Sequence, residues 1–279
     1  MSLWKEWIAG GVANAATSAL LNPLDVSKTR MQVAPGLHAG LLSTLRLLYR
    51  EGGLVGVFSP GLAASVIREM IYSGAKAGLY VPLRAHYIGL FRGNDAAAKV
   101  AAALTTGTLG SLLANPIDVV KIRLMREPRL YPSTAAALPL LYRAEGLQGL
   151  YKGLLPSTLR GACVSAGELA CYDLVKGGLK GALFSGQDGL PLHVGASLVT
   201  GAVAACVAAP WDLIKARAMA AEGRPETMRS VLRGLAAEGG LPLSLFRGLL
   251  PAYLRLGPHA LIAFPIFEQL RGALGLEYL

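Results

Sequence analysis

The stretch NPLDVSKTR, at residues 22–30, occurs in three versions along this chain, the others being NPIDVVKIR at 115–123 and APWDLIKAR at 209–217. Each version has an acid two positions after its proline, a lysine five positions after it and an arginine seven positions after it. The three prolines are 93 and 94 residues apart. Because self-similarity at a fixed period indicates a repeat architecture, we expect one domain over residues 1–279, made of repeats 1–91, 92–186 and 187–279.

Two further elements recur at the same spacing after each motif. A Glu-Gly pair ends at Gly52, Gly146 and Gly239, and a short turn (SPG, YKG or FRG) ends at Gly61, Gly153 and Gly248. Seven residues after each turn glycine comes an arginine, at Arg68, Arg160 and Arg255. A triple match of all these elements by chance is negligible, so we expect the three repeats to share one structure.

The composition is that of a membrane protein. The chain is 53% hydrophobic and 16% charged, with a mean hydropathy of +0.46, whereas soluble domains carry about 25% charged residues. Residues 7–24 and 100–117 contain no charge over 18 residues, and 189–211 contains none over 23. These lengths are close to the roughly 20 residues needed to cross a membrane as a helix. We therefore expect spanning helices rather than the core of a large soluble helical protein.

Each repeat is interpreted as two spanning helices joined by a short surface helix. The motif proline, at Pro23, Pro116 or Pro210, should bend the first span, because proline removes a backbone donor and clashes with the preceding turn. Apolar residues recur at helical spacing among basic ones at 40–51, 133–145 and 226–238, which is typical of amphipathic surface helices. The sequence thus predicts an all-α membrane protein with six transmembrane helices and three short amphipathic helices, in a pseudo-threefold bundle around a central cavity.

The net charge of +10 is explained by orientation in a membrane. Sixteen of the 27 lysines and arginines fall in the three long loops that contain the motif bases. The positive-inside rule places such loops on the negative side of the membrane, where anionic lipid also attracts them. We therefore expect no nucleic-acid partner, and the even number of spans places both termini on the opposite side.

The sequence offers no catalytic or metal-binding motif. It contains no GxSxG, no Walker lysine loop and no GxGxxG, and its four histidines are scattered. The three cysteines lie in apolar segments without CxxC spacing, which indicates neither a disulfide framework nor a zinc site. We expect no enzymatic activity, no cofactor and no metal.

The acid and lysine of each motif suggest a ring of ion pairs. An ionised side chain inside a membrane span is costly unless it is paired or faces water. Under threefold symmetry each acid can meet the lysine of the next repeat, which pairs Asp25 with Lys121, Asp118 with Lys215 and Asp212 with Lys28. We call these six residues the aspartate–lysine ring and expect it to act as a gate on the long-loop side.

A second charged pattern occurs near the ends of the even-numbered spans. Tyr172-Asp173 with Lys176 and Phe267-Glu268 with Arg271 repeat an aromatic, an acid and a base, while the first repeat has Val81 in place of the acid before Arg84. The pairs Asp173–Arg271 and Glu268–Arg84 can form, and Lys176 has no acid to meet. We call Arg84, Asp173, Lys176, Glu268 and Arg271 the second ring, and two opposed rings suggest alternating access.

The three arginines that follow the turns indicate an anion-binding level. Seven residues of helix place Arg68, Arg160 and Arg255 at one depth, roughly 10–12 Å from the turns. With no equal number of acids expected there, they should face the central cavity. Guanidinium groups bind carboxylates and phosphates through two parallel hydrogen bonds. Nearby, Glu69 would neutralise Arg68 or accept an amino group, Lys76 would add positive charge, and Glu168 is a further acid.

The triplicated motif, the Glu-Gly pairs, the aromatic-x-G turns and the closing ion pairs resemble the mitochondrial carrier family over essentially the whole chain. Within it, RLGPHALIAFPIFEQLR at 255–271, TTGTLGSLLANPIDVVKIR at 105–123 and GELACYDLVK at 167–176 are similar to the branch of oxoglutarate carriers, dicarboxylate carriers and uncoupling proteins. The resemblance implies a monomeric carrier of the mitochondrial inner membrane, with long loops on the matrix side and both termini toward the intermembrane space.

The resemblance also implies roles for individual residues. The aspartate–lysine ring would be the matrix gate, with Gln32 as a brace, and the second ring would be the cytoplasmic gate. Arg68-Glu69, Arg160-Gly161 and Arg255-Leu256 would be the substrate contact points. By analogy, cardiolipin would bind near the glycines that end the surface helices and turns, which are Gly52, Gly61, Gly146, Gly153, Gly239 and Gly248.

The function expected from these features is antiport of small anionic metabolites, which means dicarboxylates or keto acids such as malate and oxoglutarate, or inorganic oxyanions. A proton or fatty-acid leak like that of uncoupling proteins remains an alternative, because it needs no distinct motif. An amino-acid carrier is a further alternative, since Glu69 stands where glutamine is frequent in this branch. A membrane scaffold without transport is more distant.

Overall fold

A computed structural model describes residues 3–34, 40–128, 130–131, 133–164, 190–223, 228–237 and 243–275 of the chain. Within these ranges the regular structure is entirely helical. The elements in chain order are α1 (Leu3–Leu20), α2 (Asn22–Val33), α3 (Leu41–Phe58), α4 (Leu62–Leu90), α5 (Asp95–Arg126), α6 (Thr134–Leu150), a helical segment at 154–164, α8 (Leu190–Ala220), α9 (Met228–Ala237), the 3₁₀ turn η1 (Leu243–Phe246) and α10 (Leu249–Ala273).

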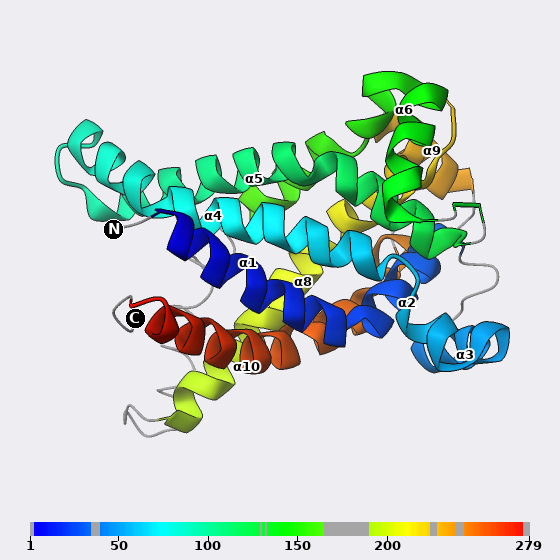
Figure 1. Ribbon diagram of the computed structural model, residues 1–279, viewed down its shortest axis with the longest axis horizontal. Coiled ribbons are helices and arrows are strands. Elements are labelled where there is room, and N and C mark those ends of the chain that lie inside the picture. The colour runs from blue at the N-terminus through cyan, green and yellow to red at the C-terminus, as the bar shows by residue number, and fades with distance from the viewer. Residues whose placement is uncertain are drawn as a thin grey trace.

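The long helices lie side by side along the molecule, and its two ends differ (Figure 1). Both chain termini lie at one end, which we call the terminal end, whereas α3, α6 and α9 lie at the other, which we call the surface-helix end. Helix α1 packs against both α4 and α10, α4 packs against α5, and α10 packs against α8. The first and last long helices of the chain are therefore neighbours, as a closed bundle requires. The predicted all-α carrier fold is confirmed.

By length and apolar content alone, two helices of the described residues could cross a membrane: α5, and residues 199–220 of α8. Helices α3 and α4 would count as a further span only if taken together across their 41° bend. Helix α4 has 29 residues but carries the charged side chains of Arg68, Glu69 and Lys76 within its first half. Its charges, rather than its length, separate it from a simple apolar span.

Each turn glycine packs against the motif of the following repeat. Gly61 has a φ of +66°, and a Cβ there would lie 3.0 Å from Met125 Cγ and 3.1 Å from the carbonyl oxygen of Lys121. The other two turns repeat this contact, with Gly153 against Met219 and Lys215, and Gly248 against Gln32 and Lys28. Left-handed backbone and close approach both favour glycine. The contacts run from repeat one to two, two to three and three to one, as pseudo-threefold symmetry predicts.

The motif prolines act differently in the three repeats. The first long helix is interrupted at Leu21, so that α2 begins one residue before Pro23. Helices α5 and α8 instead continue through Pro116 and Pro210. Of the three helices expected to bend at the motif proline, only that of the first repeat is broken there.

The surface helices begin close to where the sequence places them. Helix α6 begins after Ser133, whose hydroxyl accepts a hydrogen bond from the Ala136 amide, as a helix-capping serine does. The Glu-Gly pair then interrupts the helix, since Gly146 has a φ of +66° and Gly53, after Gly52, has a φ of +61°. The equivalent Gly239 lies outside the described residues. In the first two repeats, one or two helical turns after the break lead to the next helix.

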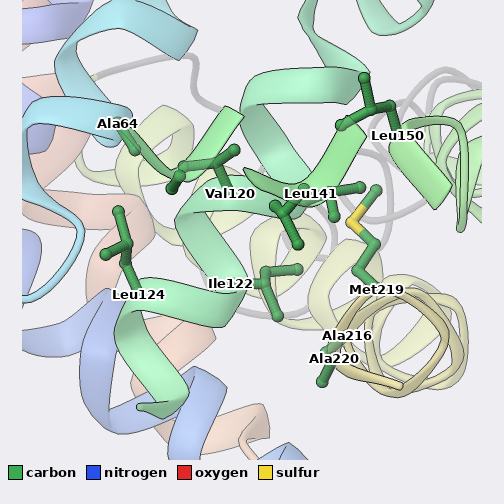
Figure 2. Packing of buried hydrophobic residues seen from close by; sticks show 11 residues of the cluster. Ala64, Val120, Ile122, Leu124, Leu141, Leu150, Ala216, Met219 and Ala220 are labelled. Atoms are coloured by element: carbon green, nitrogen blue, oxygen red, sulfur yellow. The ribbon is translucent and has the colours of Figure 1, made fainter. Parts of the chain in front are cut away.

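An apolar cluster fixes the surface-helix end of the second repeat (Figure 2). It joins Val120, Ile122 and Leu124 of α5 to Leu141 and Leu150 of α6, Ala216, Met219 and Ala220 of α8, and Ala64 of α4. The ends of α5, α6 and α8 are thereby held together by ordinary apolar packing.

Candidate functional site

The aspartate–lysine ring is closed in this structure. Lys121 Nζ lies 2.9 Å from Asp25 Oδ2, Lys215 Nζ lies 2.7 Å from Asp118 Oδ2, and Lys28 Nζ lies 2.6 Å from Asp212 Oδ2. All three predicted partners are found. The pairing follows from the motif, because residues three apart share one side of a helix, so each helix offers its acid to one neighbour and its lysine to the other.

The three arginines after the turns reach the same aspartates. Arg255 Nη1 lies 2.7 Å from Asp25 Oδ1, Arg68 Nε lies 3.0 Å from Asp118 Oδ1, and Arg160 Nε lies 2.6 Å from Asp212 Oδ1. Each aspartate thus gives one oxygen to a lysine and the other to an arginine. The expectation that these arginines lie at a level without matching acids is wrong. Helical side chains point toward the N-terminus of their helix, which for these helices is the turn beside the ring.

Exposure increases from the acids to the arginines. The aspartate side chains are 5, 8 and 11% exposed, whereas those of Arg68, Arg255 and Arg160 are 20, 25 and 41% exposed. The aspartates are therefore the more buried side chains. The guanidinium groups of Arg68, Arg160 and Arg255 form a more accessible layer, which we call the arginine layer. Arg160 is the most accessible of the three.

Glu69 belongs to the same network. Its Oε1 lies 2.5 Å from Arg68 Nη1 and 3.9 Å from Arg255 Nη2, and its Oε2 accepts a hydrogen bond of 2.7 Å from the Ser73 hydroxyl. The expected neutralisation of Arg68 by Glu69 is present. Tyr72 adds a contact that the sequence did not indicate, with its ring centre 4.5 Å from the Arg68 guanidinium carbon. Ser73 and Tyr72 follow Glu69 and Arg68 by one helical turn, which is the only signal that could have found them.

Of the remaining predicted contact residues, those whose side chains the structure describes make no contact with the three arginines. Lys76 is an exposed residue of α4, two turns beyond Arg68. Gly161 lies in the helical segment at 154–164, and a Cβ there would meet no atom within 4 Å. Leu256 lies in α10, but its side chain, like all of Glu168, is outside the described residues. Gln32 does not brace a lysine–aspartate pair: its Nε2 donates to the Arg247 carbonyl at 3.3 Å.

The second ring differs from the predicted pairing. Arg84 pairs with Asp95 across the connection between α4 and α5, at 2.6 Å, which is a partner that the pattern of the second ring did not predict. Asp95 is in the first turn of α5 and is closer to Arg84 in the chain than any acid that the threefold pattern supplies. Arg271 Nη1 donates to both carboxylate oxygens of Glu6, at 2.8 and 2.9 Å. Asp173 and Lys176 lie outside the described residues.

The last arginine of each motif connects neighbouring repeats, a role the sequence did not assign. Arg30 Nε donates to the Met125 carbonyl at 3.0 Å, Arg123 Nε donates to the Met219 carbonyl at 3.2 Å, and Arg217 Nε donates to the Gln32 carbonyl at 3.1 Å. The acceptors occupy equivalent positions in the three repeats. The signal was available, because the arginine recurs in every copy of the motif.

Glu145, from the second Glu-Gly pair, is the centre of a further network. It accepts hydrogen bonds from Arg123 Nη2 at 2.7 and 2.9 Å, from Lys152 Nζ at 2.6 Å and from the Gly223 amide at 3.1 Å. Burial by itself would raise the pKa of Glu145, but the hydrogen bonds and charges of Lys152 and Arg123 outweigh it and lower the pKa below its ordinary value. The carboxylate is therefore held ionised at the surface-helix end.

An asparagine before the motif proline ties the first two repeats to their turns. Asn22 Nδ2 donates to the carbonyls of Phe58 and Pro60, at 2.6 and 3.1 Å. Asn115 Nδ2 donates to the carbonyls of Leu150 and Lys152, at 2.8 and 3.1 Å. The third repeat has Ala209 at this position, which has no amide to offer. The three repeats are thus equivalent in the ring and unequal at the turn.

A family model described as mitochondrial carrier protein matches residues 1–90, 92–182 and 186–277. Relatives include the mitochondrial citrate transporter F of Aspergillus niger, 31% identical over 93% of this chain and 86% of that protein. The mitochondrial uncoupling protein 1 of Arabidopsis thaliana is 32% identical over 96% of this chain and 93% of its own length. The mitochondrial dicarboxylate transporter of Saccharomyces cerevisiae is 32% identical over 95% and 91%. With three family repeats and a threefold ion-pair ring, the chain belongs to the mitochondrial carrier protein family.

Proposed function

We propose that this chain exchanges small dicarboxylates, keto acids or inorganic oxyanions across the mitochondrial inner membrane by alternating access. As a member of its family it is a multi-pass protein of that membrane. The observation that carries the proposal is the threefold set of aspartates, each held by a lysine of the aspartate–lysine ring and by an arginine above it.

The chemistry of the arginine layer favours a carboxylate or phosphate ligand. Arg68, Arg160 and Arg255 already bind carboxylates, those of the aspartates. Each aspartate gives its arginine one oxygen, whereas a substrate carboxylate can bind a guanidinium through two, so it can replace an aspartate without leaving the arginine unpaired. The released aspartate then keeps only its lysine. Binding of an anion above the ring would in this way weaken the closed ring below.

The charges around the arginines favour a divalent anion. Glu69 neutralises the charge of Arg68. The charges of Arg160 and Arg255 therefore remain for a bound anion to neutralise. Both carboxylate oxygens of Glu69 have partners in Arg68 and Ser73. A substrate ammonium would have to displace one of these partners, which makes the amino-acid alternative less favourable.

We assign the surface-helix end to the matrix side and both termini to the intermembrane space. The excess of basic residues in the long loops supports this orientation. The closed aspartate–lysine ring then corresponds to the state closed toward the matrix. We further propose that the protein acts as a monomer, because a single chain supplies all three arginines, and that cardiolipin binds at the surface-helix ends and turns.

Counterflow into proteoliposomes tests the proposal. Proteoliposomes that contain the purified protein and are loaded with malate, oxoglutarate, citrate or phosphate should take up the same labelled anion from outside. Arg160→Ala should abolish this uptake while the protein remains folded. Arg92→Gly is a matched control, because Arg92 is an exposed turn residue with a φ of +52° that glycine accepts. Uptake by Arg160→Ala equal to that of wild type would remove Arg160 from the binding site.

The same preparation distinguishes the uncoupling alternative, which the relative from Arabidopsis thaliana raises. If none of the anions exchanges and added fatty acid induces proton flux, the exchanger is wrong and the leak is supported. If neither occurs, the protein is not a transporter of either kind.

A further inference from the structure

His259 is a titratable side chain near the arginine layer that has no part in the aspartate–lysine ring. It follows Arg255 by four residues in α10. Residues four apart share one side of a helix, and four residues rise about 6 Å along its axis. Because α10 begins at the turn beside the ring and runs toward the terminal end (Figure 1), His259 lies one helical turn beyond Arg255 in that direction.

The charges around the His259 ring show which side of α10 it occupies. They come from three helices and belong to Arg255, Asp25, Arg68 and Glu69. Arg255 itself lies 2.7 Å from Asp25 and 3.9 Å from Glu69, so the imidazole faces the same network as the guanidinium. His259 is partly exposed, and no hydrogen bond or ion pair joins its ring to another residue of the described ranges. The ring nitrogens are therefore available to a ligand bound at the arginine layer.

The equivalent positions of the other repeats carry different side chains. The residue four positions after each arginine of the layer is Tyr72, Val164 or His259. The Tyr72 ring lies on the Arg68 guanidinium, and a valine side chain has no polar atom. An imidazole can donate a hydrogen bond and, when protonated, carries a positive charge. The third repeat thus offers an anion a nitrogen donor that neither Tyr72 nor Val164 can supply.

A dicarboxylate has two charged ends, whereas the arginine layer provides guanidinium groups for one of them. Arg160 and Arg255 can bind the first carboxylate, as they bind aspartate carboxylates in this structure. The rise of about 6 Å between Arg255 and His259 is close to the distance between the outer oxygens of an extended four-carbon diacid. A phosphate ion is too short to reach both levels. A second carboxylate at the upper level needs a donor, because burying an unpaired charge is costly.

We propose that His259 binds the second carboxylate of a dicarboxylate whose first carboxylate is held by the arginine layer, and that it thereby distinguishes dicarboxylates from smaller oxyanions. This inference rests on the proposed exchange of small anions and narrows the substrate class. His259 contacts the substrate directly through a ring N–H, and the substrate lies along the axis of the bundle with one end toward the ring and the other toward the terminal end.

Counterflow into proteoliposomes that contain the full chain tests the inference. His259→Ala should raise the KM for malate by about tenfold or more, because a hydrogen bond to a charged group is lost. It should raise the KM for phosphate far less. His259→Gln, which keeps an N–H donor, should lie between His259→Ala and wild type for malate. His86→Ala is the matched control, because His86 is an exposed histidine of α4, and it should match wild type.

Thermal unfolding of the purified full chain separates a binding role from a structural one. Without added anion, His259→Ala should melt at the wild-type temperature, whereas malate should raise its melting temperature less than that of wild type. An unchanged KM for malate, or equal increases for malate and phosphate, would overturn the inference. Exchange of phosphate but not malate by wild type would overturn it and leave the proposed function standing. A wild-type protein that neither exchanges nor is stabilised by any of these anions would count against both.

Discussion

Replacing Glu145 by glutamine should destabilise the protein strongly, although Glu145 lies far from the arginine layer. Its carboxylate neutralises two cations, Arg123 and Lys152, whose side chains are 5 and 1% exposed. Breaking a buried pair from one side typically costs about 3–5 kcal/mol. Lys152 keeps two hydrogen bonds to the carbonyls of Ala221 and Gly223, so we expect the lower value, about 3 kcal/mol.

The first repeat supplies the matched control. Glu51 occupies the same position as Glu145 and pairs with Arg30 at 2.8 Å; the Glu51 side chain is 45% exposed, whereas that of Arg30 is 8% exposed. Because water solvates the exposed carboxylate and Arg30 Nε keeps its bond to the Met125 carbonyl, we expect the cost to be near the roughly 0–1 kcal/mol of exposed pairs. At roughly 2–4 °C for each kcal/mol, Glu145→Gln should lower the melting temperature by about 6–12 °C, whereas Glu51→Gln should lower it by about 4 °C or less.

Thermal unfolding of purified protein in detergent measures both variants. The pH dependence gives an independent check, because the pKa of Glu145 is lowered from 4.5 in the folded protein. A depressed folded pKa means that the stabilisation is complete above pH 4.5 and is lost as the pH falls below it. Glu145→Gln should therefore lose less stability than wild type between pH 5 and the acid limit. Equal melting temperatures for Glu145→Gln and Glu51→Gln would refute the reasoning from burial.

Two further substitutions test the turns by thermal unfolding. Gly61→Ala should lower the free energy of unfolding by about 2–3 kcal/mol, because alanine is strained at a φ of +66° and its Cβ would lie 3.1 Å from the carbonyl oxygen of Lys121. Gly52→Ala is the control and should be nearly neutral, because a Cβ there would meet no atom within 4 Å. Equal losses of stability in the two variants would contradict this reasoning. Asn115→Ala should lower the free energy of unfolding by about 1–3 kcal/mol, because two buried carbonyls lose their donor. It should also speed amide hydrogen exchange at residues 150–153. Unchanged exchange there would show that the Asn115 side chain does not hold the turn.

The ring could be predicted from the sequence because two periodicities combine in it. The 93-residue repeat fixes which residues are equivalent, and the three-residue spacing of acid and lysine places both on one side of each helix. Together they leave two cyclic pairings of opposite direction, and the structure has the one that joins Asp25 to Lys121. The surface helices were predictable for a similar reason, since their apolar period and the following Glu-Gly break are both written in the sequence.

The contacts of the arginines were not predictable in the same way. Counting residues gives the position of Arg68 along its helix. It does not give the direction in which the long arginine side chain extends or how far it reaches. Its guanidinium lies back toward the turn, at Asp118. Arg271 shows a second limit, because its partner Glu6 has no equivalent acid in the other two repeats and comes close only when the first and last helices meet in space.

The missing amide of the third repeat implies a direction for the motion. Asn22 and Asn115 bind the first two motif segments to their turns, whereas Ala209 has no side-chain amide to bind the third. Three equivalent ion pairs around an axis suggest a passage that widens symmetrically. Repeats that are held unequally at their turns should not move together. We expect the α8 side to yield first, so that the passage toward the matrix forms off-centre and substrate leaves past one flank of the bundle.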